Sequence, residues 1–312
     1  MTYRPPELST TRRAKQAMRG VIARPLVNRA VTTAVKPWAR FLSPRTLLHL
    51  PLNRIVSVES SYCSEPVLLD AAGFDPIASM LYWHGPGGWE PETVPVYLQL
   101  VRPGMTVLDI GANTGLFALL AARRSADTVV HAIEPVPRVF AMLEANVARN
   151  ALPNVRCHRM ALADADGVVT MYVPADEVPV MASLLAGWRP GSDQIDVEAV
   201  TLDQFVSRLG IDNVGLMKID TEGTEHAVLA GAQKTLSAHQ PFVICEVLAA
   251  GGNADAVSEQ LAAAGYLYFL LTENGPRAMQ HVVGNPSDGC HNYLFVPRSR
   301  AQQARDLFDL AC

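Results

Sequence analysis

Residues 107–115, with the sequence Val-Leu-Asp-Ile-Gly-Ala-Asn-Thr-Gly, constrain the fold more than any other stretch. An apolar run containing one acid leads into a turn with two glycines, and an apolar helical pattern follows over 116–122. This order predicts a buried strand, a tight turn and a helix, which in α/β sheets bind a nucleotide-like ligand. Gly111 and Gly115 have no Cβ, so the backbone can turn sharply and approach a ligand. An ordinary strand–turn–helix of an α/β core is the alternative.

The same alternation continues along the chain. The residues 161–167 are expected to form a turn, 174–193 an irregular insertion and 224–237 a helix. Strands are expected at 105–110, 128–133, 155–160, 214–219, 242–246, 266–271 and 291–296, with helices between them. The pattern predicts an α/β fold with a doubly wound, seven-stranded, mostly parallel sheet in a domain spanning 71–312.

The beginning of the chain differs in charge from the rest. Residues 1–54 carry 11 Lys and Arg and one acid, although the whole chain has a net charge of −4. Apolar residues in 10–42 have helical spacing, interrupted by Pro25 and ended near Pro37. We therefore expect residues 1–70 to be a basic, partly helical extension. It could pack on its own acidic body or a second copy, lie on an anionic membrane or polyanion, or be loosely ordered.

Composition favours a globular protein, since 49% of residues are hydrophobic and 18% are charged. The sequence lacks the run of ~20 apolar residues that spans a bilayer. Its first residues do not show the charged segment followed by an apolar segment that is typical of a secretory signal. Its five cysteines are widely spaced without a CxxC pair, which argues against a zinc cluster or a disulfide framework. A cytoplasmic location is expected.

Two acids indicate the class of ligand. Glu134 follows the second strand, 19 residues after Gly115, where a carboxylate holds a ribose diol. The turn departs from the GxGxxG pattern of dinucleotide sites, and Asp109 beside it would repel a pyrophosphate. An acid there suits a cationic ligand such as S-adenosylmethionine (SAM), which carries an ammonium and a sulfonium. A nicotinamide dinucleotide is the weaker alternative.

A second cluster has the sequence Lys-Ile-Asp-Thr-Glu-Gly-Thr-Glu over 218–225. In a parallel sheet, Asp220 and Glu222 would lie at the carboxyl end of a strand beside the same ligand. Carboxylates there could act as a base, bind substrate hydroxyls or hold a divalent ion, which is possible but not predicted. Helix caps and salt links to Lys218 are the alternative, and the charge of Glu225 suits the start of a helix.

Several segments together resemble one family. They are VLDIGANTG at 107–115, HAIEPVP at 131–137, ALADADG at 161–167, VTLDQF at 200–205, KIDTEGTEHAVLAGA at 218–232 and PFVICEV at 241–247. These segments, with 89–93 and 292–297, resemble the FkbM family of SAM-dependent methyltransferases, over about 88–297. The resemblance implies a class I methyltransferase fold whose last strand is antiparallel. It also implies methyl transfer to oxygen on sugars, polyketides or other secondary metabolites.

The resemblance also assigns site residues. Glu134 would hold the ribose, and Asp220 would face the methyl group. The expected cofactor-binding residues are Glu92, Asp109, Gly111, Ala112, Asn113, Gly115, Leu116, Phe117, Glu134, Pro135, Ala161 and Asp220. The chemistry, and not the resemblance, gives the catalytic candidates, because a weakly acidic hydroxyl needs a base to take its proton. They are Asp220, Glu222 and His84, with His226 and His281 as further candidate bases. The loop 83–93 and the insertion 174–193 are expected to shape the acceptor pocket.

The expected partner is a small hydroxylated molecule and not a nucleic acid, with membrane or homo-oligomer contact through 10–42. The alternative function is a non-catalytic methyltransferase-like scaffold that binds a partner or membrane through the basic arm.

Overall fold

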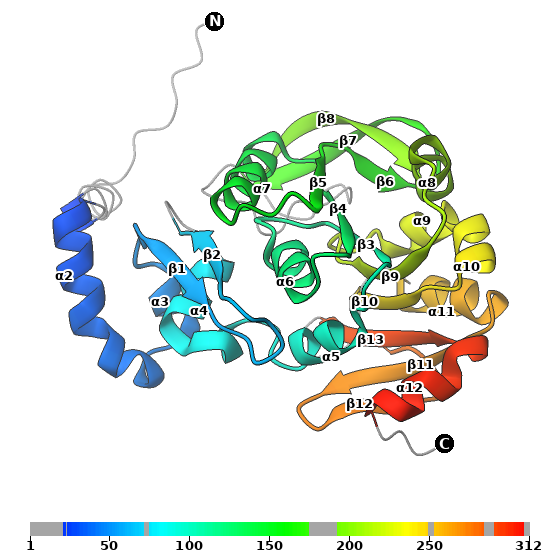
Figure 1. Cartoon of the computed structure of the whole chain (residues 1–312). Coiled ribbons are helices and arrows are strands. Elements are labelled where there is room, and N and C mark those ends of the chain that lie inside the picture. Colours follow the sequence, from blue (N-terminus) through cyan, green and yellow to red (C-terminus); the bar gives the residue numbers. More distant parts are fainter. Residues whose placement is uncertain are drawn as a thin grey trace, which may run out of the picture. The chain divides into compact units, whose positions relative to one another are not determined.

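The computed structural model of the chain describes residues 21–22, 24–71, 75–174, 192–248, 253–283 and 290–308 (Figure 1). Two compact units share the chain. The N-terminal unit is Met1–Val58 with Leu69–Trp89, and the main unit is Glu59–Leu68 with Glu90–Cys312. These units divide the chain at other positions than the expected boundary between residues 70 and 71.

Helices and one small sheet make up the first part of the chain. Helix α2 begins at Pro25 and ends before Pro37, which agrees with the helix-breaking role expected of these prolines. Asp75 caps α4, because its Oδ1 accepts hydrogen bonds from the backbone N–H groups of Ile77 and Ala78. The elements are α2 Pro25–Val35, the 3-10 helix η1 Lys36–Phe41, α3 Pro44–Leu48, strands β1 Ile55–Val58 and β2 Val67–Asp70, α4 Pro76–His84 and η2 Gly85–Gly88.

The main unit is built on a sheet of order β12-β11-β13-β10-β9-β3-β4-β5. Strands β5, β4, β3, β9 and β10 are parallel, and β13 is antiparallel to β10, as the resemblance implied. The strands are β3 Thr106–Ile110, β4 Val129–Ile133, β5 Val155–His158, β9 Val214–Ile219, β10 Phe242–Leu248, β11 Tyr266–Thr272, β12 Gly275–Met279 and β13 Cys290–Pro297. The α/β fold with a mostly parallel sheet is confirmed.

The prediction of seven strands was wrong by one strand. Strand β12 pairs antiparallel with β11 at the edge of the sheet. It contains Pro276 and Arg277, and its residues are half-buried or exposed, so it has no apolar run that would reveal a strand. The turn between β11 and β12 is formed by residues close together in the chain. Gly275 has φ +95°, and the Thr272 hydroxyl donates to the Gly275 carbonyl.

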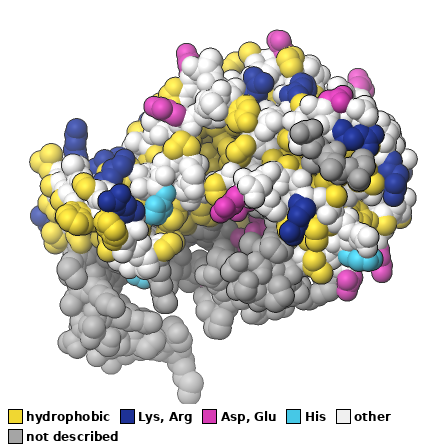
Figure 2. Space-filling view, turned by 90° about the horizontal axis from the view of Figure 1, so that it is seen from below, with side chains coloured by type: hydrophobic (Ala, Val, Ile, Leu, Met, Phe, Trp, Pro, Cys, Tyr) yellow, Lys and Arg dark blue, Asp and Glu magenta, His cyan; other side chains and the backbone are white. Residues whose placement is uncertain are grey.

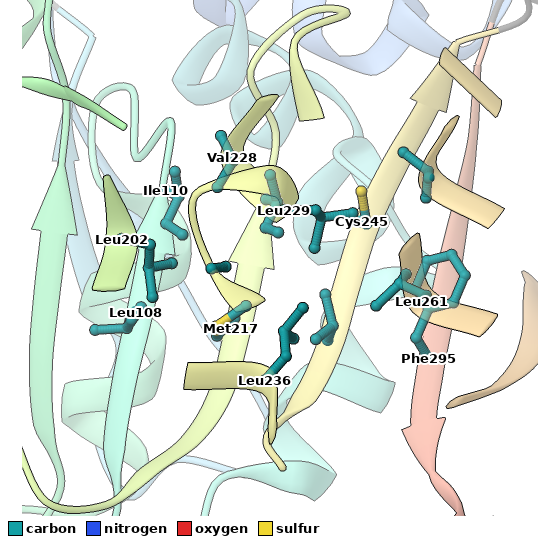
Figure 3. Close-up of a cluster of buried hydrophobic side chains, with 14 of the residues drawn as sticks. Leu108, Ile110, Leu202, Met217, Val228, Leu229, Leu236, Cys245, Leu261 and Phe295 are labelled. Carbon is teal, nitrogen blue, oxygen red and sulfur yellow. The ribbon is translucent and has the colours of Figure 1, made fainter. Parts of the chain in front are cut away.

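Helices cover the two faces of the sheet. Side chains of α8–α11 pack with alternate residues of β3, β9, β10 and β13 in one apolar core (Figure 3). Helix α6 packs on β3 and β4. The helices are α5 Thr93–Leu100, α6 Leu116–Arg124, α7 Pro137–Arg149, α8 Leu202–Leu209, α9 Glu225–Ala230, α10 Gln233–His239, α11 Asn253–Ala263 and α12 Ala301–Phe308. Among the described helices, none is long and apolar enough to cross a membrane.

Two local predictions were wrong for a shared reason. The expected turn at 161–167 begins with strand β6 Ala161–Ala163, which pairs with β8 Ser192–Thr201, and β8 also pairs with β7 Gly167–Pro174. The expected helix 224–237 is two helices, α9 and α10. They break at Gly231, where an added Cβ would lie 2.2 Å from the Ala163 carbonyl oxygen. Close packing against the three-stranded sheet of β6, β8 and β7 therefore ends α9. Residues 175–191 of the expected insertion lie outside the described residues.

Candidate functional site

The glycine turn lies where β3, β4 and β9 end. The backbone N–H groups of Gly111 and Ala112 both donate to the Ile133 carbonyl at the end of β4, at 3.0 and 2.9 Å. Gly111 has φ +78°, and a Cβ there would lie 1.8 Å from the Asp220 carbonyl oxygen. Glycine is therefore required both by conformation and by space. The two segments singled out in the sequence meet at this point.

Glu134 shapes the turn from the neighbouring strand. Its Oε2 accepts from the Asn113 backbone N–H at 3.0 Å, and its Oε1 accepts from that of Val136 at 2.9 Å. Burial raises the pKa of Glu134 to about 7, although these two N–H groups act to lower it. Asn113 has φ +50°, an uncommon conformation outside glycine that these contacts hold.

Asp109 and Lys218 are register partners on the adjacent parallel strands β3 and β9. Their chain neighbours belong to the core under α8–α11, and because side chains alternate along a strand, both residues face the opposite side. Asp109 is 1% exposed. Burial raises the pKa of Asp109 to about 7, and Lys218 moderates that shift. Among the described residues, the Asp109 Oδ2 atom has no hydrogen-bond partner.

Lys218 is the centre of this charged cluster. Its Nζ lies 2.7 Å from the Asp220 Oδ2 and 3.5 Å from the Glu90 Oε1, and 4.3 Å from the centroid of the Phe117 ring. Burial acts to lower the pKa of Lys218, but the carboxylates of Asp220, Glu90 and Asp109 together raise it above its ordinary value. A permanent cation therefore lies among three acids, and the Asp220 side chain is 26% exposed.

Glu90 was missed in the sequence. Its Oε2 accepts from the Asn292 Nδ2 at 3.1 Å, which links the loop before α5 to strand β13. Burial raises the pKa of Glu90, with Lys218 opposing that shift. Glu90 has φ +40°, which no pattern in the sequence reveals. The expected residue was Glu92, whose buried Oε2 has no hydrogen-bond partner within the described part of the chain.

Glu225 has a second role, which the sequence did not predict. Its Oε1 accepts from the backbone N–H groups of Thr221 and Gly223 and from the Thr221 hydroxyl, at 2.9, 3.0 and 3.1 Å. Its Oε2 accepts from the Asn253 Nδ2 at 2.6 Å. This buried carboxylate holds the turn between β9 and α9. A helix-dipole role had been expected for Glu225. An acid that follows Gly223 by two residues is the signal that could have revealed the turn-holding role.

Three carboxylates gather beyond this turn. Oxygen atoms of Asp220, Glu222 and Glu246 lie within 4.8 Å of one another, and all three side chains are half-buried. Glu222 has φ +55°. Such oxygen donors could hold a divalent ion, so the structure brings together two of the expected catalytic residues.

The remaining expected residues lie in several places. Phe117 packs edge-on against Tyr97, with ring centroids 5.1 Å apart. Ala112, Leu116 and Ala161 are buried, and Pro135 is half-buried after β4. His84 is exposed at the end of α4 in the N-terminal unit, and His281 is exposed after β12. His226 is half-buried, and its Nδ1 lies 3.0 Å from the Asn253 Oδ1.

Comparison with known proteins decides the family. The model of the methyltransferase FkbM domain matches residues 109–268, about half of the chain. The chain belongs to the FkbM methyltransferase family. The match begins at Asp109 and contains Gly111, Glu134, Lys218 and Asp220, so most of the charged cluster lies inside the FkbM domain.

Two relatives of this FkbM domain are methyltransferases by name. The chain is 29% identical over 208 residues to 31-O-demethyl-FK506 methyltransferase FkbM of Streptomyces tacrolimicus, a match that covers 56% of this chain and 77% of that protein. It is 26% identical over 163 residues to 2-O-methyltransferase NoeI of Sinorhizobium fredii, covering 47% and 66%.

A solved structure is also similar. It is that of methyltransferase FkbM from Methylobacillus flagellatus, with a TM-score of 0.41 and 16% identity over 85% of this chain and 60% of that one.

Proposed function

We propose that this protein is a SAM-dependent O-methyltransferase that transfers a methyl group to a hydroxyl of a sugar, glycoside or polyketide-type natural product. The observation that carries the proposal is the meeting of Gly111 and Asp220 at the ends of adjacent strands. This contact joins the glycine turn, which suits a cofactor, to a half-buried carboxylate that suits an acceptor. Membership of the FkbM family supports the reaction class.

The described residues fit SAM. Asp109 has a buried carboxylate oxygen without a hydrogen-bond partner in the described chain, and an ammonium would satisfy it. Each oxygen of Glu134 accepts one backbone hydrogen bond and keeps a second lone pair for a ribose hydroxyl. Gly111 lets the Asp220 backbone approach the glycine turn closely, so the turn adjoins the Asp220 carboxylate.

When bound, SAM would supply an electrophilic methyl group for transfer to an acceptor oxygen, with its sulfur as the leaving group. The protein must then align the two reactants and take up the hydroxyl proton. Asp220 is our candidate base, because its carboxylate is partly exposed at the strand end. Lys218 orients that carboxylate through the 2.7 Å contact, and Glu225 holds the turn that follows it. Glu222 is the second candidate.

The acceptor class rests on the relatives. The names of the FkbM and NoeI proteins specify O-methylation at position 31 of one compound and at a 2-O position. Both describe oxygen acceptors, and we extend that chemistry to this chain. Methylation of a sugar hydroxyl needs a base or a metal ion to help remove the proton, since sugar hydroxyls are weak acids. The carboxylates around Asp220 supply both options.

Titration calorimetry with SAM tests the proposal. We expect binding by the full chain, its loss in Asp109→Ala and Glu134→Ala, and no change in the exposed control Asp212→Ala. Asp220→Ala should lose turnover, followed as a 14 Da gain on hydroxylated acceptors, more than SAM affinity. Absence of SAM binding at millimolar SAM would reject the enzyme in favour of a scaffold. A nicotinamide absorbance change would instead favour a dehydrogenase.

A further inference from the structure

Helix α2 buries two polar side chains and no apolar one. The two residues of α2 that are buried are Asn28 and Thr32. Asn28 donates to the Pro51 carbonyl and accepts from the Asn53 backbone N–H, and the Thr32 hydroxyl accepts from an Arg54 guanidinium N–H. An ordinary surface helix does the reverse, burying its apolar stripe and exposing its polar side. The apolar residues of α2 therefore contribute little to the described core.

Large apolar side chains lie on the outside instead. Leu26 is 85% exposed, Trp38 is 64% exposed and Phe41 is 67% exposed. Leu26, Ala30, Ala34 and Trp38 recur every four residues and are all exposed, which places them along one side of α2 and its continuation η1. We name Leu26, Val27, Trp38, Phe41 and Leu42 the α2–η1 apolar surface. A grouped apolar surface of this kind marks an interaction site.

The charge around this surface has one sign. Residues 8–58 contain neither Asp nor Glu. The N-terminal unit holds 11 Lys and Arg against three acids, Glu7, Asp70 and Asp75, a net charge of +8. On the described part, Arg24, Arg29, Lys36 and Arg40 are exposed. Hydrophobic and Lys or Arg side chains are intermingled on this unit, at the left of Figure 2.

The combination selects one kind of partner. Exposed Leu, Trp and Phe flanked by Arg and Lys are typical of helices that lie in the interface of an anionic bilayer. A nucleic acid would use the cations but leave Leu26 in water. A neutral apolar protein surface would cover Leu26 but leave the excess positive charge without counter-charges. Arg40 lies over the Phe41 ring, 4.7 Å from its centroid, so a cation and an apolar group are presented together.

We propose that the α2–η1 apolar surface docks on an anionic membrane. Leu26, Trp38 and Phe41 would enter the boundary between headgroups and acyl chains, while Arg24, Arg29 and Arg40 contact lipid phosphates. Attachment would be peripheral, and it is independent of the proposed methyl transfer.

Flotation of the full chain with lipid vesicles tests this proposal. We expect binding to vesicles of phosphatidylcholine mixed with phosphatidylglycerol, and little binding to phosphatidylcholine alone. The triple variant Leu26→Ser, Trp38→Ser, Phe41→Ser should lose at least tenfold in partitioning. The variant Arg24→Gln, Arg29→Gln, Arg40→Gln should lose about a hundredfold, since each basic side chain near an anionic surface contributes about 1 kcal/mol. Added salt should weaken binding of the parent chain.

The control is Val168→Ser, which removes a 72% exposed apolar side chain from the main unit and should leave binding unchanged. Thermal unfolding verifies that each variant folds. Equal binding by the apolar triple variant and the parent chain would overturn the proposal. A dimer in light scattering that this variant dissociates, without vesicle binding by the parent, would overturn it in favour of a second copy. Binding of a duplex oligonucleotide but not of vesicles would overturn it in favour of a polyanion.

Discussion

A Cβ atom on Gly111 would lie 1.8 Å from the carbonyl oxygen of Asp220. The backbone N–H of Asp220 also donates to the Ile110 carbonyl at 3.0 Å. Two segments about 110 residues apart in the chain therefore meet backbone to backbone at the end of β3 and β9. Any change in the turn would also move Asp220, the candidate base.

Gly111→Ala should destabilise the protein by about 2–5 kcal/mol. The left-handed backbone costs about 1–2 kcal/mol for a residue with a Cβ, and the clash with Asp220 adds about 1–3 kcal/mol. Gly104→Ala is the matched control, because Gly104 has φ +76° but open space around its Cβ position. It should lose only the conformational part. Chemical denaturation measures both, and equal losses would show that the close approach is not restrictive.

Lys218→Met should destabilise the protein by about 3–5 kcal/mol, because it leaves buried carboxylates without their cation. The double variant with Asp220→Asn should lose less than the sum of the two single variants, since it also removes one of the carboxylates that Lys218 pairs with. Lys234→Met is the control on an exposed position of α10. Additive losses in denaturation would contradict a direct interaction of Lys218 with Asp220.

Glu225→Gln should cost about 1.5–3 kcal/mol, the usual value of hydrogen bonds to a charged group. The amide keeps one acceptor oxygen but places an NH2 where the carboxylate accepts a second set of bonds. Because Glu225 holds the turn and not the cofactor, kcat should fall more than SAM affinity. Glu259→Gln on the exposed side of α11 is the control. An unchanged kcat in a destabilised Glu225→Gln protein would leave Glu225 with a structural role alone.

Asp109→Asn should change how stability depends on pH. The pKa of Asp109 is about 7 in the folded state and about 3.9 in an unfolded chain. Between these values the folded state binds more protons, so the Asp109 contribution to the free energy of unfolding falls as pH rises from about 4 to about 7. The slope reaches at most about 1.4 kcal/mol per pH unit.

Urea denaturation of the parent chain and Asp109→Asn across that range measures this contribution as their difference. The parent should lose stability relative to the variant as pH rises. A difference that is constant, or that grows in favour of the parent, would mean that Asp109 is ionised throughout in the folded protein.

The strands, the glycine turn and the fold class could be predicted from the sequence alone. The glycines at 111 and 115, the acid at 134 and the apolar strands predicted the α/β fold, because strand burial and turn conformation are imposed by neighbouring residues. Strand β12 was not predicted, because its pairing with β11, and not the pattern of its own residues, makes it a strand. The break between α9 and α10 at Gly231 was not predicted, because it depends on contact with Ala163, about 70 residues earlier in the chain.

The sequence by itself determined the resemblance to the family, the parallel strands of the sheet and the acids at the ends of those strands. Only the tertiary structure decided which of these groups interact. Glu90 and not Glu92 contacts Lys218, Asp109 lies beside Lys218 in register, and α2 buries the polar residues Asn28 and Thr32. Charge pairing and burial depend on distances through space. Residues far apart in the chain set those distances, so no local pattern can specify them.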